Sequence, residues 1–229
     1  TVGIQLMFSS DKWFGASAGF YPETIGQSLR FEDGDSPYLT RTPASAGSRT
    51  TWTWSAWIKR GNLSFGAPTM FSSATNYDQL RLDSSDRIIF AVYTNNGATN
   101  VGTFTTKQKF RDTTNWYHVV AVWDTTNSTS EDRQRLYING KRILPADLTI
   151  TTTPSSSAVS NFNNEQMTIG RRESTDNIYW DGYMAEVNFL DGTAVTHTQD
   201  SNGDYILDEF GQVKNGVWIP KSLSSLTYG

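Results

Sequence analysis

Apolar and polar side chains alternate every two residues along several stretches of this chain, which is the period of a strand with one buried face. Residues 51–59 show it most clearly and turn four apolar side chains to one side, namely Trp52, Trp54, Ala56 and Ile58. Residues 115–123 are apolar on both sides, which predicts a strand in the middle of a sheet. Shorter alternating stretches lie at residues 28–31, 79–82, 87–93, 101–105 and 166–169.

A hairpin is predicted after residues 133–139, where alternate side chains from Gln134 to Ile138 are expected to face inward. This stretch leads into Asn139-Gly140, and an Asn-Gly pair is a strong hairpin signal because both turn positions need a positive φ. A last strong strand is predicted at residues 182–190, whose alternation sends four side chains to one face: Tyr183, Ala185, Val187 and Phe189.

The other segments are predicted to be less regular. Residues 149–164, rich in Thr, Ser and Asn, are expected to form an exposed loop, and a short strand is expected at residues 217–219. No window of a dozen residues keeps the 3.6-residue period of a helix. The pattern therefore predicts an all-β fold, an antiparallel β-sandwich.

Composition agrees with this fold class and narrows the function. The 53 Ser and Thr residues and the 13% of aromatic residues favour β structure, and 229 residues suit one domain. The absence of cysteine excludes disulfides, thiolate nucleophiles and cysteine-based zinc sites. A net charge of −4 lacks the basic excess of a nucleic-acid-binding protein, and no apolar stretch approaches the 18 residues of a membrane span. Neither nucleic acid nor membrane insertion is expected.

Three parts are predicted: an N-terminal arm at residues 1–27, a sandwich domain at residues 28–190 and a C-terminal extension at residues 191–229. The extension is expected to pack on the sandwich or on a neighbour. The arm carries four large aromatic residues among Gly and Ser: Trp13, Phe14, Phe20 and Tyr21. Such an arm is too apolar to stay in water by itself, so it is expected to dock on its own sandwich or on another subunit, and a homo-oligomer is predicted.

Several of these segments together resemble the LamG or pentraxin-like branch of the concanavalin A-like jelly rolls. They come in family order, at residues 28–31, 38–39, 51–59, 116–120, 136–141, 169–170 and 182–187. The resemblance spans most of residues 28–190 and implies that the sandwich is a jelly roll of this kind.

A narrower resemblance is to virion-associated proteins of tailed phages of aquatic bacteria. It rests on residues 20–22, 27–31, 38–43, 52–55, 59–61, 185–192 and 218–221. In that group the pattern continues past a Tyr-Gly step into a further apolar strand, whereas this chain ends at Tyr228-Gly229. The resemblance implies a non-enzymatic decoration, appendage or fibre protein on the virion surface, which contacts other virion proteins and adheres to cell-surface glycan.

An enzyme of the β-glucan-hydrolysing kind, which shares this general fold, would carry Glu, then Asp two residues on and Glu three further. Glu186 is followed by Asn188 and Asp191, so the spacing is absent and Glu186 is interpreted as structural. His118 lies in a strand that is apolar on both sides and is interpreted as a hydrogen-bonded core imidazole. No catalytic residue is predicted, and turnover of a polysaccharide that depends on Glu186 would overturn this interpretation.

Calcium is the one cofactor that the sequence suggests. Asp200, Asn202 and Asp204 alternate like the start of an EF-hand loop, but Tyr205 and Gly211 occupy the positions that need Gly and Glu. The alternative is a solvated turn closed by Asp and Asn side chains.

Glycan binding would need exposed aromatic rings, and the candidates are Tyr77, Tyr93, Tyr179 and Trp180. The alternative is that such rings fill the core or a subunit interface. The two leading hypotheses are thus a virion structural or adhesion module and a lectin, free-standing or part of a longer protein, with or without calcium.

Overall fold

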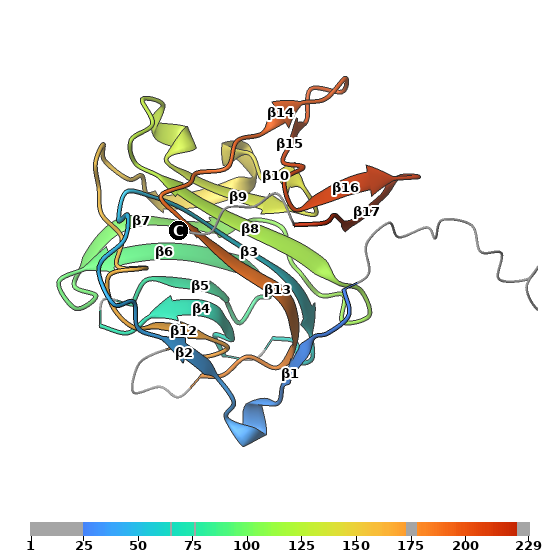
Figure 1. Cartoon of the computed structure of the whole chain (residues 1–229), viewed down its shortest axis with the longest axis horizontal. Helices are drawn as coiled ribbons and strands as arrows, with labels where there is room; N and C mark the ends of the chain where they lie inside the picture. Colours follow the sequence, from blue (N-terminus) through green and yellow to red (C-terminus); the bar gives the residue numbers. More distant parts are fainter. Residues whose placement is uncertain (1–24, 65, 76, 173–177, 224–229) are drawn as a thin grey trace, which may run out of the picture.

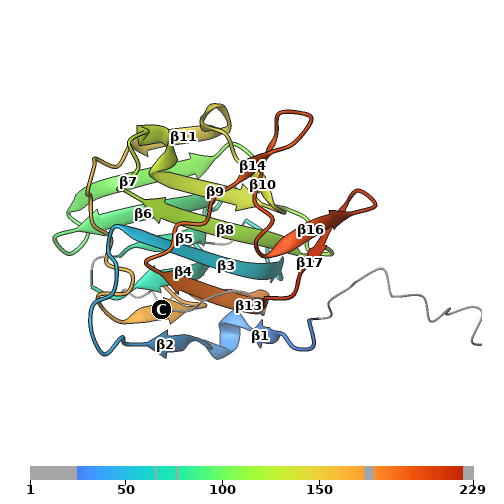
Figure 2. The same cartoon turned by 45° about the horizontal axis from the view of Figure 1, so that its top comes forward.

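The computed structural model describes residues 25–64, 66–75, 77–172 and 178–223, and in them two antiparallel sheets pack face to face (Figures 1 and 2). Every strand pair in these residues is antiparallel, and the short helical segments are single 3₁₀ turns: η2 (Asp33–Asp35), η3 (Ser130–Asp132) and η4 (Pro145–Asp147). The predicted all-β antiparallel sandwich is therefore confirmed. Within the same residues no helix has the length and apolar character to cross a membrane.

The first sheet has eight strands. Their order across the sheet is β1 (Leu29–Phe31), β13 (Gly182–Asp191), β3 (Thr51–Arg60), β8 (Tyr117–Asp124), β9 (Gln134–Ile138), β10 (Lys141–Arg142), β15 (Tyr205–Ile206) and β14 (Thr198–Gln199).

The second sheet has seven strands, and a separate two-stranded hairpin follows it in the chain. The order is β11 (Leu148–Thr152), β7 (Thr99–Thr106), β6 (Ile88–Thr94), β5 (Gln79–Leu82), β4 (Thr69–Ser73), β12 (Met167–Ile169) and β2 (Leu39–Arg41). The hairpin pairs β16 (Gly211–Lys214) with β17 (Val217–Pro220) and stands beside the eight-stranded sheet (Figure 1).

The strongest alternating stretches form the centre of the eight-stranded sheet. Trp52 and Trp54 of β3 are almost fully buried in the core between the sheets, as the alternation predicts. The strand predicted to be covered on both faces, β8, lies between β3 and β9. Its outward side chains Val120 and Val122 are covered by a second apolar cluster that includes Leu207 and Phe210 of the C-terminal extension.

Strand β13 contains a bulge that the alternation did not reveal. Its register with β3 shifts between Ala185 and Asn188, and Glu186 in the bulge has a φ of 46°. Met184 faces the core before the bulge, whereas Val187 packs against it afterwards. The prediction of one unbroken face was wrong because one extra residue exchanges the two faces of a strand.

Residues 149–164 are not one exposed loop, which corrects the prediction. The stretch begins in the edge strand β11, and Ser160 and Asn161 are buried. The Ser160 hydroxyl accepts a hydrogen bond from the Trp52 indole N–H at 2.7 Å, and the Asn161 backbone N–H donates to Asp78. Polar side chains here satisfy buried groups rather than water, which composition alone does not distinguish.

The Asn139-Gly140 turn and the hairpin after it determine the surface beside β3 and β8. Both turn residues have a positive φ, 50° and 78°, as predicted. A Cβ on Gly140 would lie 2.3 Å from a ring atom of Trp218, and one on Gly211 would lie 2.5 Å from the same ring. Two glycines therefore make room for the Trp218 ring, which packs closely on both and links the β16–β17 hairpin to the sheet.

The division into residues 1–27, 28–190 and 191–229 remains a prediction. Most of the predicted arm, with Trp13, Phe14, Phe20 and Tyr21, lies outside the described residues.

Candidate functional site

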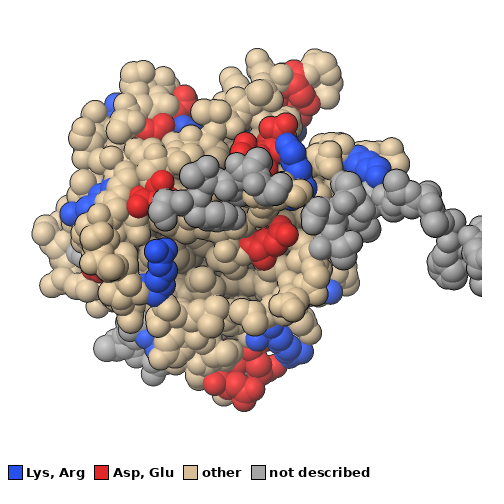
Figure 3. All heavy atoms as spheres, viewed as in Figure 1, with Lys and Arg blue, Asp and Glu red and all other residues tan. Residues whose placement is uncertain are grey.

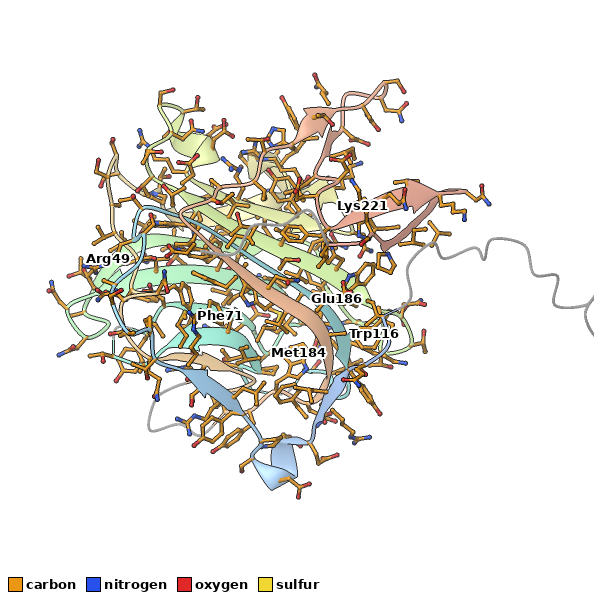
Figure 4. All side chains as sticks on the ribbon, in the orientation of Figure 1. Arg49, Phe71, Trp116, Met184, Glu186 and Lys221 are labelled. Carbon is orange, nitrogen blue, oxygen red and sulfur yellow. The ribbon has the colours of Figure 1, made fainter. Side chains whose placement is uncertain are left out.

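A pocket of about 770 Å³ opens on the outward face of the eight-stranded sheet. It lies between the β16–β17 hairpin, residues 25–28 and residues 112–117. Three indole rings line it, those of Trp57, Trp116 and Trp218, and we call it the tryptophan pocket. Trp116, one of the three, is labelled in Figure 4.

The rings line up because of strand register. Trp57 takes an outward position on β3, since the even-numbered side chains of that strand fill the core. His118 lies opposite Trp57 on β8, with ring centroids 4.8 Å apart, and Trp218 stacks on His118 at 5.9 Å. Trp116 lies just before β8, is half-exposed, and packs against Tyr183 at 6.3 Å. Trp116 and Trp218 are both partly exposed, whereas Trp57 is almost fully buried.

Two amides at the rim are held in fixed orientations. The Asn139 side-chain oxygen accepts the His118 backbone N–H at 2.8 Å, so the NH₂ group of Asn139 points away from that bond. The Asn115 NH₂ group donates to Asp112, which leaves the Asn115 oxygen as an acceptor. The indole N–H groups of Trp57 and Trp218 are buried, and neither has a hydrogen-bond partner among the described residues. The two amides thus offer the pocket one oriented donor and one oriented acceptor beside apolar rings.

Asp112 is the one charged side chain among the described residues that line this pocket. Hydrogen bonds from Thr114 and Asn115 lower the pKa of Asp112 to about 2. The carboxylate is therefore ionised at neutral pH and has no proton to give to a leaving group.

The structure brings a serine and a histidine together, but in the protein interior. Ser55 Oγ lies 2.9 Å from His118 Nε2, and both residues are fully buried. Burial lowers the pKa of His118 to about 3, so the imidazole is neutral at ordinary pH. The interpretation of His118 as a hydrogen-bonded core residue is confirmed, because its ring is fully buried and bonded to Ser55.

The four aromatic residues predicted for glycan binding lie elsewhere. Trp180 is fully buried in the core and offers no ring face to a sugar, which corrects that prediction. Tyr77, Tyr93 and Tyr179 are half-buried, and none of them lines the tryptophan pocket. The Tyr179 ring instead packs near the Tyr38 ring, with 6.4 Å between the ring centroids.

The predicted calcium loop is the turn between β14 and β15. One Asp200 oxygen accepts the backbone N–H groups of Asn202 and Asp204, both at 2.9 Å. Asp204 also forms a 2.7 Å ion pair with Lys141. These oxygens close a turn, in line with the alternative stated from the sequence.

A different group of carboxylates does come together. Oxygens of Glu32, Asp33 and Asp181 lie within 4.8 Å of one another. Burial and the charges of Asp33 and Glu32 raise the pKa of Asp181. The cluster was missed because Asp181 joins the other two only through the pairing of β1 with β13.

Sequence reasoning also missed the tryptophan pocket. One signal was present, because the alternation of residues 51–59 leaves Trp57 as a large apolar side chain on the polar face. Trp116 and Trp218 are brought beside it by tertiary contacts with the C-terminal hairpin.

Comparisons with known proteins agree with the fold. Residues 33–199 match a family model described as the concanavalin A-like lectin/glucanases superfamily. No curated protein has a matching sequence.

Solved structures share the fold at low sequence identity. NanB with optactamide is 16% identical, with a TM-score of 0.52 over 82% of this chain and 29% of that one. The native heptameric SAP-like pentraxin from Limulus polyphemus is 16% identical, with a TM-score of 0.48 over 70% of this chain and 71% of that one. The CBM40 of Ruminococcus gnavus IT-sialidase bound to alpha2,3 sialyllactose is 12% identical, with a TM-score of 0.44 over 65% and 90%.

Proposed function

The chain belongs to the concanavalin A-like lectin/glucanases superfamily, and on that premise we propose that it is a non-catalytic carbohydrate-binding module. The observation that carries the proposal is the tryptophan pocket, where three indoles and two oriented amides surround about 770 Å³. That volume is within the range of small-molecule sites, which are mostly apolar with a few fixed polar groups.

The pocket matches the two kinds of surface that a sugar presents. The half-exposed Trp116 ring is placed to stack on the C–H face of a sugar. The Asn139 NH₂ group and the Asn115 oxygen are placed to bond hydroxyl groups, and neither has to reorient first, because His118 and Asp112 already hold them. A preorganised site of this kind loses less entropy on binding.

The same geometry argues against hydrolysis. Glycosidases of the common types need two carboxyl groups on either side of the bond, one of them protonated. The described lining of the pocket contains Asp112 alone, and Asp112 is held ionised by its hydrogen bonds.

Replacing Trp116 by Ala is expected to weaken binding to a glycan found on an array by about tenfold or more, because the stacking ring is lost. Trp116→Phe is expected to retain most of the affinity. The measurement is isothermal titration calorimetry, with Tyr179→Ala as the matched aromatic control. Binding that is lost in Tyr179→Ala but kept in Trp116→Ala would move the site to the surface predicted from the sequence.

Calcium remains part of the lectin hypothesis. Glu32, Asp33 and Asp181 provide the hard oxygen ligands that calcium takes and are the residues that would hold it. A bound ion would supply positive charge that offsets their mutual repulsion. Glu32 and Asp33 follow β1 in the chain, whereas the residues that line the pocket beside this strand, 25–28, precede it. Adding a chelator to the same titration is therefore expected to leave the glycan affinity unchanged.

We extend the proposal to a place on a phage virion, where the module would contact other virion proteins or further copies of itself and adhere to cell-surface glycan. The narrower sequence resemblance supports this extension. Mass spectrometry of purified virions tests it: the protein is expected among the structural components. Its absence there would favour a lectin, free-standing or part of a longer protein.

A further inference from the structure

A second hollow adjoins the tryptophan pocket and differs from it in chemistry. It has a volume of about 590 Å³ and shares Gly26, Gln27, Ser28 and Ala185 with the pocket. Beyond these residues its lining is mainly apolar, and we call it the edge groove: Leu29, Phe31, Leu39, Ile169, Met184 and Val187.

The groove exists because the sandwich is open along one side. Strand β1 pairs with β13 only from Gly182 to Met184. Past the bulge at Glu186, no described strand pairs with β13 on the side away from β3. The opposite wall comes from the other sheet, where Leu39 of β2 lies opposite Ile169 of β12. The face shown in Figure 3 is hollowed near its centre, where most of the surrounding residues are uncharged and one acidic group lies at the edge.

The floor of the groove is fixed, whereas its rim exposes apolar side chains to water. The Phe31 ring packs so closely on Gly170 that a Cβ there would lie 2.5 Å from it, and Phe31 and Met184 are both only 2% exposed. At the rim Leu29 is 53% exposed and Leu39 47%. Exposed apolar side chains around a preformed hollow are typical of a surface that binds an apolar group.

We propose that the edge groove binds an alkyl or acyl substituent of the saccharide held in the tryptophan pocket, so that the ligand is an acylated saccharide or a glycolipid. This inference rests on the proposed function. The shared wall at Gly26–Ser28 and Ala185 carries the argument, because it lets one ligand contact both hollows.

The experiment compares methyl and octyl β-glycosides of glucose, galactose and N-acetylglucosamine, each below its micellar concentration. The octyl glycoside of the sugar that binds is expected to bind at least about tenfold more tightly than its methyl partner, since two or more buried methylenes suffice for that gain. In methyl-labelled protein the Met184 signal is expected to shift with octyl glycosides alone. Met70 and Met167, buried in the core away from the groove lining, serve as internal controls.

Leu39→Ser is expected to remove most of the octyl gain and to leave the methyl glycoside affinity unchanged. The matched control is Leu144→Ser, because Leu144 is similarly exposed and lies outside the groove.

Each other outcome overturns a defined part of the account. Methyl and octyl glycosides of equal affinity, with Trp116 perturbed by both, would overturn the inference and leave the proposed function standing. A shift of the Met184 signal with octyl glycosides, without any change at Trp116, would overturn both the inference and the proposed function. The alkyl chain would then bind independently of a sugar. No Met184 shift with any octyl glycoside would show that the groove does not accept the chain.

Discussion

Replacing Asp86 by Ala is expected to lower the free energy of unfolding by about 3–5 kcal/mol, the cost of breaking a buried ion pair from one side. Asp86 and its partner Arg60 are almost fully buried, with 2.8 Å between Arg60 Nη1 and Asp86 Oδ1. Arg111 Nε and the Ser64 backbone N–H donate to the same carboxylate at 2.8 and 2.7 Å. Without Asp86 the partners left to the buried Arg60 guanidinium, among the described residues, are the backbone carbonyls of Phe110 and Asn62.

The same carboxylate gives this stability a pH dependence of known sign. Burial alone would raise the pKa of Asp86, but hydrogen bonds from Ser64, Arg60 and Arg111 outweigh it and hold the pKa well below its ordinary value. A carboxyl group with a lowered folded-state pKa stabilises the fold fully above the unfolded-state pKa of about 4, and the contribution is lost as the pH falls below it.

Urea unfolding at pH 7 and pH 3 measures both effects. From pH 7 to pH 3 the free energy of unfolding is expected to fall further in the parent protein than in Asp86→Ala. Asp35→Ala, which removes an exposed carboxylate from η2, is the control and is expected to behave like the parent. A change below about 1 kcal/mol in Asp86→Ala at pH 7 would contradict the buried-pair account, since that is the range of surface pairs.

Gly140→Ala is expected to damage both the fold and the tryptophan pocket. A non-glycine residue at a φ of 78° costs roughly 1–2 kcal/mol, and the new Cβ would meet the Trp218 ring at 2.3 Å. Because Trp218 forms one wall of the pocket, its displacement is expected to reduce glycan affinity by about tenfold or more, the loss expected for an aromatic anchor.

Gly192→Ala separates the two causes. Gly192 has a φ of 70°, but an added Cβ there would meet nothing within 4 Å. This control is expected to show the backbone cost in its melting temperature and an unchanged glycan affinity. Equal glycan affinities for both variants would contradict the role assigned to Trp218.

The central strands could be predicted from the sequence because their alternation reflects one buried face. Trp52 and Trp54 identify the inner face of β3, and Asn139-Gly140 forms the expected turn. The bulge at Glu186 could not be predicted, since regular alternation and a shifted register look alike until β13 is paired with β3. Strand β4 was also missed, because its sequence from Thr69 to Ser73 includes polar side chains that are nevertheless buried.

The candidate site was less predictable than the fold because it is assembled by tertiary contacts. Trp57 was visible as an outward indole, but its partners Trp116 and Trp218 belong to a loop and to the C-terminal hairpin. Trp180 was mistaken for an exposed ring because residue type does not report the burial of a tryptophan outside a regular strand. A large aromatic residue on the polar face of an alternating strand is the more useful signal.

The central claim is that a glycan binds in the tryptophan pocket, and the indole N–H resonances of the protein test it most directly. During titration with a glycan from the array, the signals of Trp57, Trp116 and Trp218 are expected to shift together. Those of the four core indoles, Trp52, Trp54, Trp123 and Trp180, are expected to stay in place. Saturable glycan binding that leaves the three pocket signals unmoved would contradict the account.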